Sequence, residues 1–353
     1  MTGMISWLIT PVCRLLAVKF GILDHPGQRK IHFSPKPYLG GLAIYLAMYV
    51  VIIAGLVFAL SFPHVIQNYF PSQITIYIPN IDSVMSKLSV LFVTGTFMFI
   101  LGLLDDKYVL KPSIKFLCQI GIISVAAILG IRLDLFLNSP ILSIFVTVLW
   151  ITAITNALNF MDNMDGLSAG VTTIASLIFL IHSLQLGHVY MAVILAVFSG
   201  AVLGFLPHNY PVSKIFMGDA GALFIGYNLG SLTVMNSYYY VGNPNWLPLL
   251  LPLFVLSMPL FDLISVMIIR IRNHKPVYIG DKNHFSHRLI ALGLSQKQSL
   301  WTIYLVTFIT GCGALLLKDL SFLQGILVLV QMIAVFSVVT VLERAGRNIT
   351  SSN

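Results

Sequence analysis

The stretch at residues 156–170 reads NALNFMDNMDGLSAG and lies between two apolar runs, 140–157 and 168–186, each close to the length that crosses a bilayer. It contains three Asn, two Asp and two Gly. Polar and charged groups are costly at a membrane, and where they occur they usually serve a function. The stretch therefore predicts a ligand-binding turn at the end of a membrane helix.

The composition of the whole chain agrees with this placement. Of the 353 residues, 58% are hydrophobic and only 9% are charged, whereas soluble domains carry about 25% charged residues. A water-soluble protein is therefore excluded. We predict an all-α polytopic integral membrane protein with about eleven transmembrane helices. The eleven apolar segments are 3–21, 41–62, 88–104, 114–131, 140–157, 168–186, 189–206, 219–236, 246–268, 299–316 and 320–341.

The positive charges are distributed unevenly between the two sides. All but three of the 20 Lys and Arg residues border the loops after the odd-numbered segments or the C-terminus; the exceptions are Lys87, Arg132 and Lys318. Cytoplasmic loops are enriched in Lys and Arg, so we expect the N-terminus outside and the C-terminus in the cytoplasm. We expect one transmembrane catalytic domain at 1–342 and a short cytoplasmic tail at 343–353. Its cytoplasmic active-site loops are predicted at about 22–40, 105–113, 157–167, 207–218 and 269–298.

Two adjacent acids, Asp105 and Asp106, close the third segment in LGLLDDKYVLKPSIKF. At the membrane border such a pair can bind a divalent cation, or one member can act as a base. Lys115 and Gln119, one turn apart, share a helix face. The alternative is a solvated loop whose lysines reach into water.

In the opening stretch, polar residues recur at every third position: Asn156, Asn159, Asp162 and Asp165. This spacing keeps them on one side of a helix end, where their oxygens suit a hard cation or a sugar phosphate. In the alternative interpretation, Asp165 or Ser168 merely caps the next helix.

A third motif, HNYPVSKIFMGDAGALFIG, places Asn209 before a Pro-containing turn, Phe216 near the cytosolic face, and Asp219 at the start of a helix. A helix N-terminus beside Gly218 and Gly221 offers N–H groups to a phosphate, and Asp219 is a candidate ligand for the accompanying metal ion. The alternative is that Asp219 is a plain N-cap.

A fourth motif, GDKNHFSHRLIALGLS, places His284, His287 and Arg288 on one predicted cationic helix face, which favours an anion site. Zinc binding is less favoured, because the sequence offers no further Cys or spaced His to complete a tetrahedral set of ligands. The alternative to an anion site is an amphipathic helix at the membrane surface. The first cytoplasmic loop adds a basic patch of Arg29, Lys30, His32 and Lys36.

Five motifs in this order resemble those of the polyprenyl-phosphate N-acetylhexosamine-1-phosphate transferases. They are RKIHFSPKPYLGG, LGLLDDKYVLKPSIKF, NALNFMDNMDGLSAG, NYPVSKIFMGDAG and DKNHFSHRL. The superfamily includes the enzymes that initiate enterobacterial-antigen and teichoic-acid synthesis and, more distantly, the peptidoglycan translocase. The resemblance covers most of the chain, from the first segment to the loop after the ninth.

The resemblance implies a reaction and a set of roles. A UDP-N-acetylhexosamine, with GlcNAc expected, would give its sugar-1-phosphate to undecaprenyl phosphate in the bacterial cytoplasmic (inner) membrane and release UMP. Asp105 and Asp106 would receive and activate the lipid phosphate, and Mg²⁺, with Mn²⁺ as a substitute, would be bound by Asp219 and Asn159. The residues implied in substrate binding are Lys115, Asn156, Asp162, Asn163, Asp165, Asn209, Phe216, His284, His287 and Arg288.

The chain departs from the family pattern at two positions. Asn163 stands where the family usually has Gly, and Ser286 replaces one of two adjacent His near the end of the histidine motif. These departures leave the sugar open and argue against the translocase subtype.

Two other classes of function are weighed against this one. An intramembrane aspartyl protease would explain paired acids but not residues 156–170. An ion-coupled transporter predicts acids near the bilayer midplane, whereas here only Asp262 lies inside an apolar segment, near its cytoplasmic half. Membrane lipids are expected partners, nucleic acid is not, and a homodimer is left open.

Overall fold

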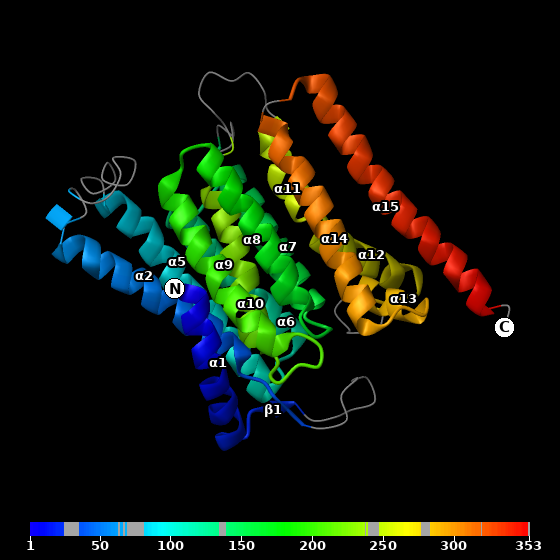
Figure 1. The fold of residues 1–353 in the computed structure, drawn as a ribbon, viewed down its shortest axis with the longest axis horizontal. Coiled ribbons are helices and arrows are strands. Elements are labelled where there is room, and N and C mark those ends of the chain that lie inside the picture. The colour runs from blue at the N-terminus through cyan, green and yellow to red at the C-terminus, as the bar shows by residue number, and fades with distance from the viewer. Residues whose placement is uncertain are drawn as a thin grey trace.

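The computed structural model describes residues 1–24, 35–62, 64–65, 68, 81–133, 139–236, 238, 247–276, 283–318 and 320–351 (Figure 1). Ten of the eleven predicted segments coincide with single helices, which run side by side through the molecule. They are α1 (Thr2–Lys19), α2 (Gly40–Ser61), α5 (Ile81–Tyr108), α6 (Pro112–Ile128), α7 (Pro140–Met161), α8 (Leu167–Gln185), α9 (Val189–Asn209), α10 (Gly218–Met235), α14 (Gln296–Leu315) and α15 (Phe322–Ser351).

The all-α membrane architecture is confirmed at the level of length and hydropathy. Within the described parts of the chain, seven helices are long and apolar enough to cross a membrane, and the number rises to eight if one bent pair counts as a single span. Helices α1, α6 and α10 fall outside these seven, so a total of eleven spans stays a prediction, as does the orientation of the termini.

The predicted ninth span is not one helix. It divides into η1 (Leu247–Leu250), α11 (Leu251–Val255) and α12 (Ser257–Arg272), and the axis bends by 65° between the first part and α12. Pro259 lies four residues after Val255, so its ring would clash with the Val255 carbonyl in a continuous helix. The chain therefore breaks at Leu256, and this break places α12 beside the short helix α13 (Phe285–Ala291).

Helix α10 forms the centre of the bundle and packs on α2, α5 and α7. Every residue from Ala220 to Val234 is buried. Small residues permit the close packing: a Cβ atom on Gly41 of α2 would lie 2.3 Å from the Gly221 Cα of α10. The start of α10, which carries Asp219, is thereby fixed against three neighbouring helices.

The C-terminal helix α15 lies at the edge of the molecule beside α14 (Figure 1). Its apolar side chains, such as Leu323 and Val341, are largely exposed, as expected for a surface that faces lipid. The helix continues through residue 343, where the sequence predicts the start of a tail, to Ser351.

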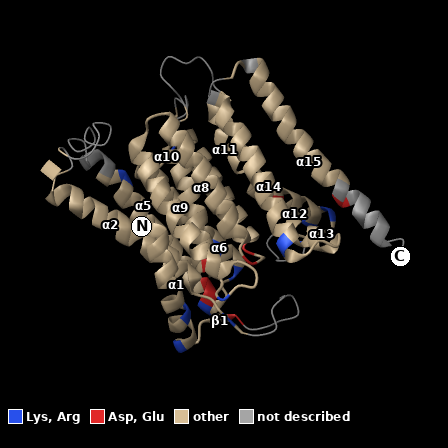
Figure 2. Cartoon of the chain, viewed as in Figure 1, with Lys and Arg blue, Asp and Glu red and all other residues tan. Residues whose placement is uncertain are grey.

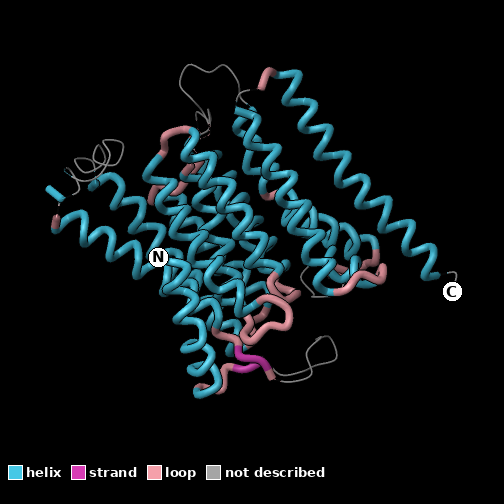
Figure 3. The backbone as a smooth tube through the Cα atoms, viewed as in Figure 1, coloured by secondary structure: helices cyan, strands magenta, loops and turns pink. Residues whose placement is uncertain are grey.

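Most of the Lys, Arg, Asp and Glu positions that are coloured lie toward one end of the bundle, and long parts of the helices have none (Figure 2). The described residues contain one pair of short strands at this end, β1 (Leu23–Asp24) and β2 (Lys36–Pro37), which are antiparallel (Figure 3). The Phe216 N–H donates to the Pro37 carbonyl over 2.9 Å, so the first loop is tied to the turn before α10.

Candidate active site

The ammonium of Lys115 is the centre of the candidate site. Its Nζ lies 2.7 Å from Asp105 Oδ2, 2.9 Å from Asp219 Oδ1 and 3.3 Å from Asn159 Oδ1. The Asn159 amide also donates to Asp219 Oδ1 over 2.5 Å. Helices α5, α6, α7 and α10 each contribute one of these residues. We call Asp105, Asp106, Lys115, Asn159 and Asp219 the carboxylate cluster.

The two neighbouring acids of α5 have different partners. Asp105 is 9% exposed, pairs with Lys115 and accepts from the Leu110 N–H, so a solvated loop is excluded. Asp106 instead accepts from the N–H groups of Asp219 and Ala220, at 2.8 and 3.0 Å, and thereby caps α10. The prediction that this helix N-terminus offers free N–H groups to a phosphate is wrong at these two positions. Asp219 is not a plain cap either, because its carboxylate faces Lys115.

The predicted stripe from Asn156 to Asp165 is only partly formed. Asn159 and Asp162 lie on the side of the carboxylate cluster, and Asn156 donates to Gln119 Oε1, one turn along α6 from Lys115, over 2.8 Å. Burial, and then the Asp219 and Asp106 carboxylates, raise the pKa of Asp162 well above its ordinary value. A cation near this position would offset the concentration of negative charge.

Asp165 turns away from the stripe because α7 ends at Met161 and Gly166, at φ +76°, begins α8. Its carboxylate accepts from Ser213 N and Oγ, at 3.0 and 2.8 Å. Neither Asp165 nor Ser168 caps α8, since Ser168 donates to the Leu158 carbonyl. The alternative of a simple cap is therefore wrong.

Asn209 joins the same turn from the end of α9. Its Oδ1 accepts from the Gly166 N–H over 3.0 Å, and its amide donates to the Ile215 carbonyl over 3.1 Å. The residue is 2% exposed, so it organises the turn before α10 rather than projecting from it. Its predicted role in substrate binding stays a prediction.

Phe216 is half-buried and lies beside this turn. Lys36 Nζ is 5.4 Å from the centre of its ring, and Tyr38 meets it edge to face at 6.0 Å. Lys36 also donates to Ser213 Oγ over 3.2 Å. Arg29, Lys30 and His32 lie outside the described residues. One face of Phe216 thus has a basic neighbour, which suits an anionic ligand with an aromatic ring.

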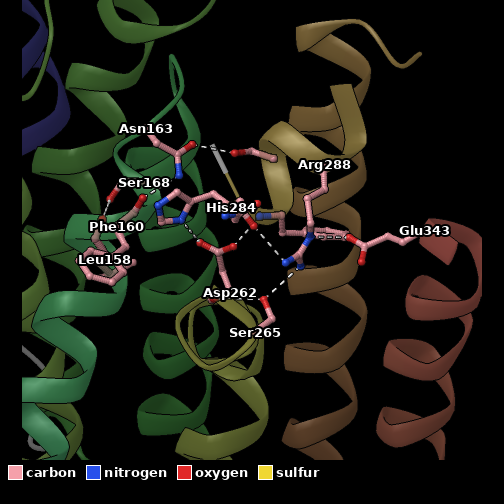
Figure 4. Close-up of polar contacts among 12 residues, drawn as sticks. Leu158, Phe160, Asn163, Ser168, Asp262, Ser265, His284, Arg288 and Glu343 are labelled. Carbon is pink, nitrogen blue, oxygen red and sulfur yellow. Dashed lines mark hydrogen bonds and ion pairs between the residues drawn. The ribbon is translucent and has the colours of Figure 1, made fainter. Parts of the chain in front are cut away.

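The histidine motif does not form the predicted cationic face (Figure 4). His284 is 5% exposed and its Nδ1 lies 2.9 Å from Asp262 Oδ2. Arg288 is 6% exposed and donates to Glu343 Oε1 of α15, to the Asn283 carbonyl and to Ser265 Oγ, at 2.9 to 3.0 Å. His287 is half-buried, with its ring centre 6.4 Å from that of His284. Arg288 is thus enclosed by protein partners, and its predicted role in substrate binding stays a prediction.

The departures from the family pattern contact each other. Ser286 Oγ donates to Asn163 Oδ1 over 2.7 Å, and the Asn163 amide donates to the Phe160 carbonyl over 2.7 Å. The end of α7 therefore carries two sets of side chains. Asn159 and Asp162 lie toward the carboxylate cluster, while Phe160 and Asn163 lie toward α13.

The donor groups of the carboxylate cluster fit Mg²⁺. Among the residues that the structure describes, no three His, Cys, Asp or Glu side chains could hold a metal ion by themselves. Asp219, Asn159 and Asp105 instead present only oxygen ligands, gathered around an ammonium. Mg²⁺ prefers oxygen ligands and commonly takes one or two carboxylates, with water and substrate phosphates as the rest.

Several residues of the site have no local signal in the sequence. A Cβ atom at Gly218 would lie 2.6 Å from the Tyr38 ring and 2.7 Å from Asp106 Oδ2, so Tyr38 borders the cluster. Ser213 and Glu343 act through partners 48 and 55 positions away. Gln119 could be found from its spacing to Lys115, and Asp262 from its charge within an apolar segment.

Comparison with known proteins gives consistent results. The model of glycosyl transferase family 4 matches residues 88–237, which contain the carboxylate cluster. The chain is 33% identical over 320 residues to a probable undecaprenyl-phosphate N-acetylglucosaminyl 1-phosphate transferase of Bacillus subtilis. This alignment covers 88% of the chain and 82% of the Bacillus protein. It is also 32% identical over 339 residues to a decaprenyl-phosphate N-acetylglucosaminephosphotransferase of Mycobacterium tuberculosis, in an alignment that covers 88% of this chain and 80% of that protein.

A more distant relative extends the same result. An undecaprenyl-phosphate alpha-N-acetylglucosaminyl 1-phosphate transferase of Thermotoga maritima is 24% identical over 304 residues. This alignment covers 86% of the chain and 83% of the Thermotoga protein. The described helices and these matches, which run over most of both chains, identify a multi-pass membrane enzyme. The chain therefore belongs to the polyprenyl-phosphate N-acetylglucosamine-1-phosphate transferase superfamily, within glycosyl transferase family 4.

Proposed function

We propose that the protein transfers N-acetylglucosamine-1-phosphate from UDP-GlcNAc to undecaprenyl phosphate and releases UMP, in the first membrane step of a cell-surface polysaccharide pathway. The names of the relatives support the sugar and the lipid class. The observation that carries the proposal is the Lys115 ammonium, held among the oxygens of Asp105, Asn159 and Asp219 at the charged end of the bundle.

The chemistry requires charge neutralisation more than covalent help. An oxygen of the lipid phosphate attacks the β-phosphorus of the UDP-sugar, a new P–O bond forms, and the bond to the α-phosphate oxygen breaks as UMP leaves. Both reactants are anions, so positioned cations are the main catalytic requirement. Lys115 contacts the phosphates directly, and we favour direct attack over an aspartyl-phosphate intermediate.

The chain's own groups divide the remaining tasks. Asp219 and Asn159 would hold Mg²⁺, which supplies further neutralisation of the diphosphate. Asp105 keeps Lys115 in place, and Asp106 holds the start of α10 so that Asp219 faces the cluster. Phe216, with Lys36 over its ring, offers a stacking surface for the uracil base.

The location of the cluster suits two substrates from different phases. A polyprenyl phosphate presents its phosphate at the bilayer surface, while a nucleotide-sugar arrives from water. A net charge of +8, with most charged side chains at this end, attracts both anions. We place this end at the cytosolic face of the inner membrane.

The geometry does not favour the two other classes. An aspartyl protease needs two carboxylates that share a proton, but here Lys115 forms an ion pair with both Asp105 and Asp219. A transporter would use Asp262 for ions, yet both oxygens of Asp262 are occupied by the first turn of α13.

The test uses purified protein in nanodiscs with undecaprenyl phosphate, Mg²⁺ and a panel of UDP-sugars. We expect UMP release only with lipid acceptor present, highest with UDP-GlcNAc, abolished by EDTA, and matched by a lipid diphosphate sugar in the mass spectrum. Folded protein that releases no UMP from any UDP-sugar would refute the proposal.

A further inference from the structure

Asp262 is a buried carboxylate that the proposed transfer does not use. It lies in α12, is 2% exposed, and has both oxygens directed to the first turn of α13 (Figure 4). Oδ2 lies 2.9 Å from His284 Nδ1, and Oδ1 accepts from the Phe285 N–H over 2.6 Å. A buried carboxylate is costly unless such partners satisfy it.

These contacts determine which nitrogen of His284 remains for another partner. An ionised carboxylate only accepts hydrogen bonds, so Nδ1 must carry the hydrogen that it shares with Asp262. Nε2 is the remaining ring nitrogen. The His284 ring meets Phe160 edge to face at 5.7 Å, and Figure 4 places it between Asp262 and the end of α7.

A second contact fixes the same turn of α13 from the other side. Ser286 donates to Asn163, whose amide donates to the Phe160 carbonyl. Phe160 directly follows Asn159, which donates to Asp219 of the carboxylate cluster, and Asn163 lies one turn further along the same helix end. His284 is thus anchored to the same helix end that helps to form the cluster.

We propose that Asp262 is a positioning residue for the transfer reaction: it fixes the tautomer and direction of His284, so that Nε2 contacts the nucleoside diphosphate sugar. The inference rests on the proposed function. The competing role is purely structural, with Asp262 serving only to cap α13 through the Phe285 N–H.

Asp262→Asn separates the two roles. The Asn Oδ1 still accepts from Phe285, so the cap is retained, but its NH₂ now faces His284 Nδ1 and can only donate. Nδ1 then becomes an acceptor and the ring hydrogen moves to Nε2. The substitution therefore reverses the tautomer of His284 and leaves the size of the side chain unchanged.

The experiment is a double-mutant cycle of wild type, Asp262→Asn, His284→Gln and the double variant, with UDP-GlcNAc and undecaprenyl phosphate in nanodiscs. We expect Asp262→Asn to lower kcat/KM for UDP-GlcNAc about tenfold to a hundredfold, by analogy with the loss seen when the hydrogen-bond partner of a metal-bound His is removed. The KM for the lipid should stay unchanged. In the His284→Gln background, Asp262→Asn should cause no further loss.

Ser265→Ala, on the next turn of α12, is the control and should retain activity within about threefold. Ser265 contacts the Asp262 backbone carbonyl and Arg288, but neither the Asp262 carboxylate nor the His284 ring. Thermal unfolding checks that all variants fold. Loss of activity that adds in the double variant, or no loss in Asp262→Asn, would overturn the inference while the transferase proposal stands. A wild-type protein without UMP release would overturn both.

Discussion

Lys115 links residues that lie far apart in the sequence. Its ammonium contacts Asp105 of α5, Asn159 of α7 and Asp219 of α10, and its side chain is 15% exposed. Without Lys115, neither the Asp105 nor the Asp219 carboxylate would keep this ion pair. Lys115 therefore serves the fold of the site before any substrate binds, and its charge is available when phosphates arrive.

Replacing Lys115 by Met should lower kcat for UMP release by about 10² to 10³, because a positioned charge on the transferred phosphoryl group is lost. Lys115→Arg keeps the charge but not the compact ammonium, and should retain more activity than Met. Initial rates at saturating substrates measure the effect, and thermal unfolding monitors the fold. If Lys115→Met kept kcat within threefold of wild type, phosphate contact by Lys115 would be refuted.

The sequence predicts which residues belong to the site better than it predicts which residues they contact. The acids, amides and Lys115 were found from motif spacing, and Asp105, Lys115, Asn159 and Asp219 do meet. The cap that Asp106 places on α10 joins positions 113 residues apart, which no local spacing reveals. The same holds for Arg288, where spacing of three and four residues predicted one cationic face but tertiary contacts enclosed the side chain.

At the scale of elements, the site depends on how closely α5 and α10 pack. A Cβ atom on Gly102 would lie 2.4 Å from the Asp219 carbonyl oxygen and 2.5 Å from the Ala220 N and Cα. These are backbone atoms of α10, so they cannot turn aside as a flexible side chain would. Helix separation at this point directly sets the position of Asp219 relative to Asp105.

Gly102→Ala should therefore lower both the midpoint of thermal unfolding and kcat, since overpacking costs about 1–3 kcal/mol and displaces Asp219. Gly121→Ala in α6 is the matched control, because nothing lies within 4 Å of its Cβ position. There the better helix propensity of Ala should leave stability equal or slightly higher. Equal behaviour of the two variants would contradict the close α5–α10 packing.

The buried pair of Arg288 and Glu343 connects α13 to α15. Glu343→Ala should destabilise the protein by about 3–5 kcal/mol, because it leaves a buried guanidinium without its counter-charge. The double variant Arg288→Met, Glu343→Leu should recover much of this loss, since no charge is then left unpaired. Thermal unfolding in detergent measures both. A Glu343→Ala protein as stable as wild type would show that the pair contributes nothing.

Helix positions were predictable because apolar runs of bilayer length leave few alternatives. The break at Leu256 and the end of α15 were not predicted, for different reasons. Pro259 breaks the helix, but the run around it stays apolar overall, so hydropathy does not reveal the break. The charge of Glu343 suggests a solvated tail from this residue onward, but Glu343 accepts a hydrogen bond from the buried Arg288 of α13.

At the scale of the whole molecule, the uneven distribution of charge predicts an orientation. We expect Lys214→Cys, in a chain without its three native cysteines, to react with an impermeant maleimide only from the cytosolic side of the membrane. Lys87→Cys should react only from the outside, and both native lysines are exposed. Labelling in intact cells and in inverted vesicles measures the sidedness. The opposite pattern would invert the proposed topology.

The most direct measurement of the central claim compares UMP release by Asp219→Asn and by Glu343→Gln with that of the wild type, in the presence of UDP-GlcNAc, undecaprenyl phosphate and Mg²⁺. Asp219→Asn removes a charge from the carboxylate cluster and should lower kcat by at least about 10². Glu343→Gln keeps a hydrogen-bond acceptor for Arg288 on α15 and should retain activity close to that of wild type. A fully active Asp219→Asn enzyme would show that the transfer occurs elsewhere.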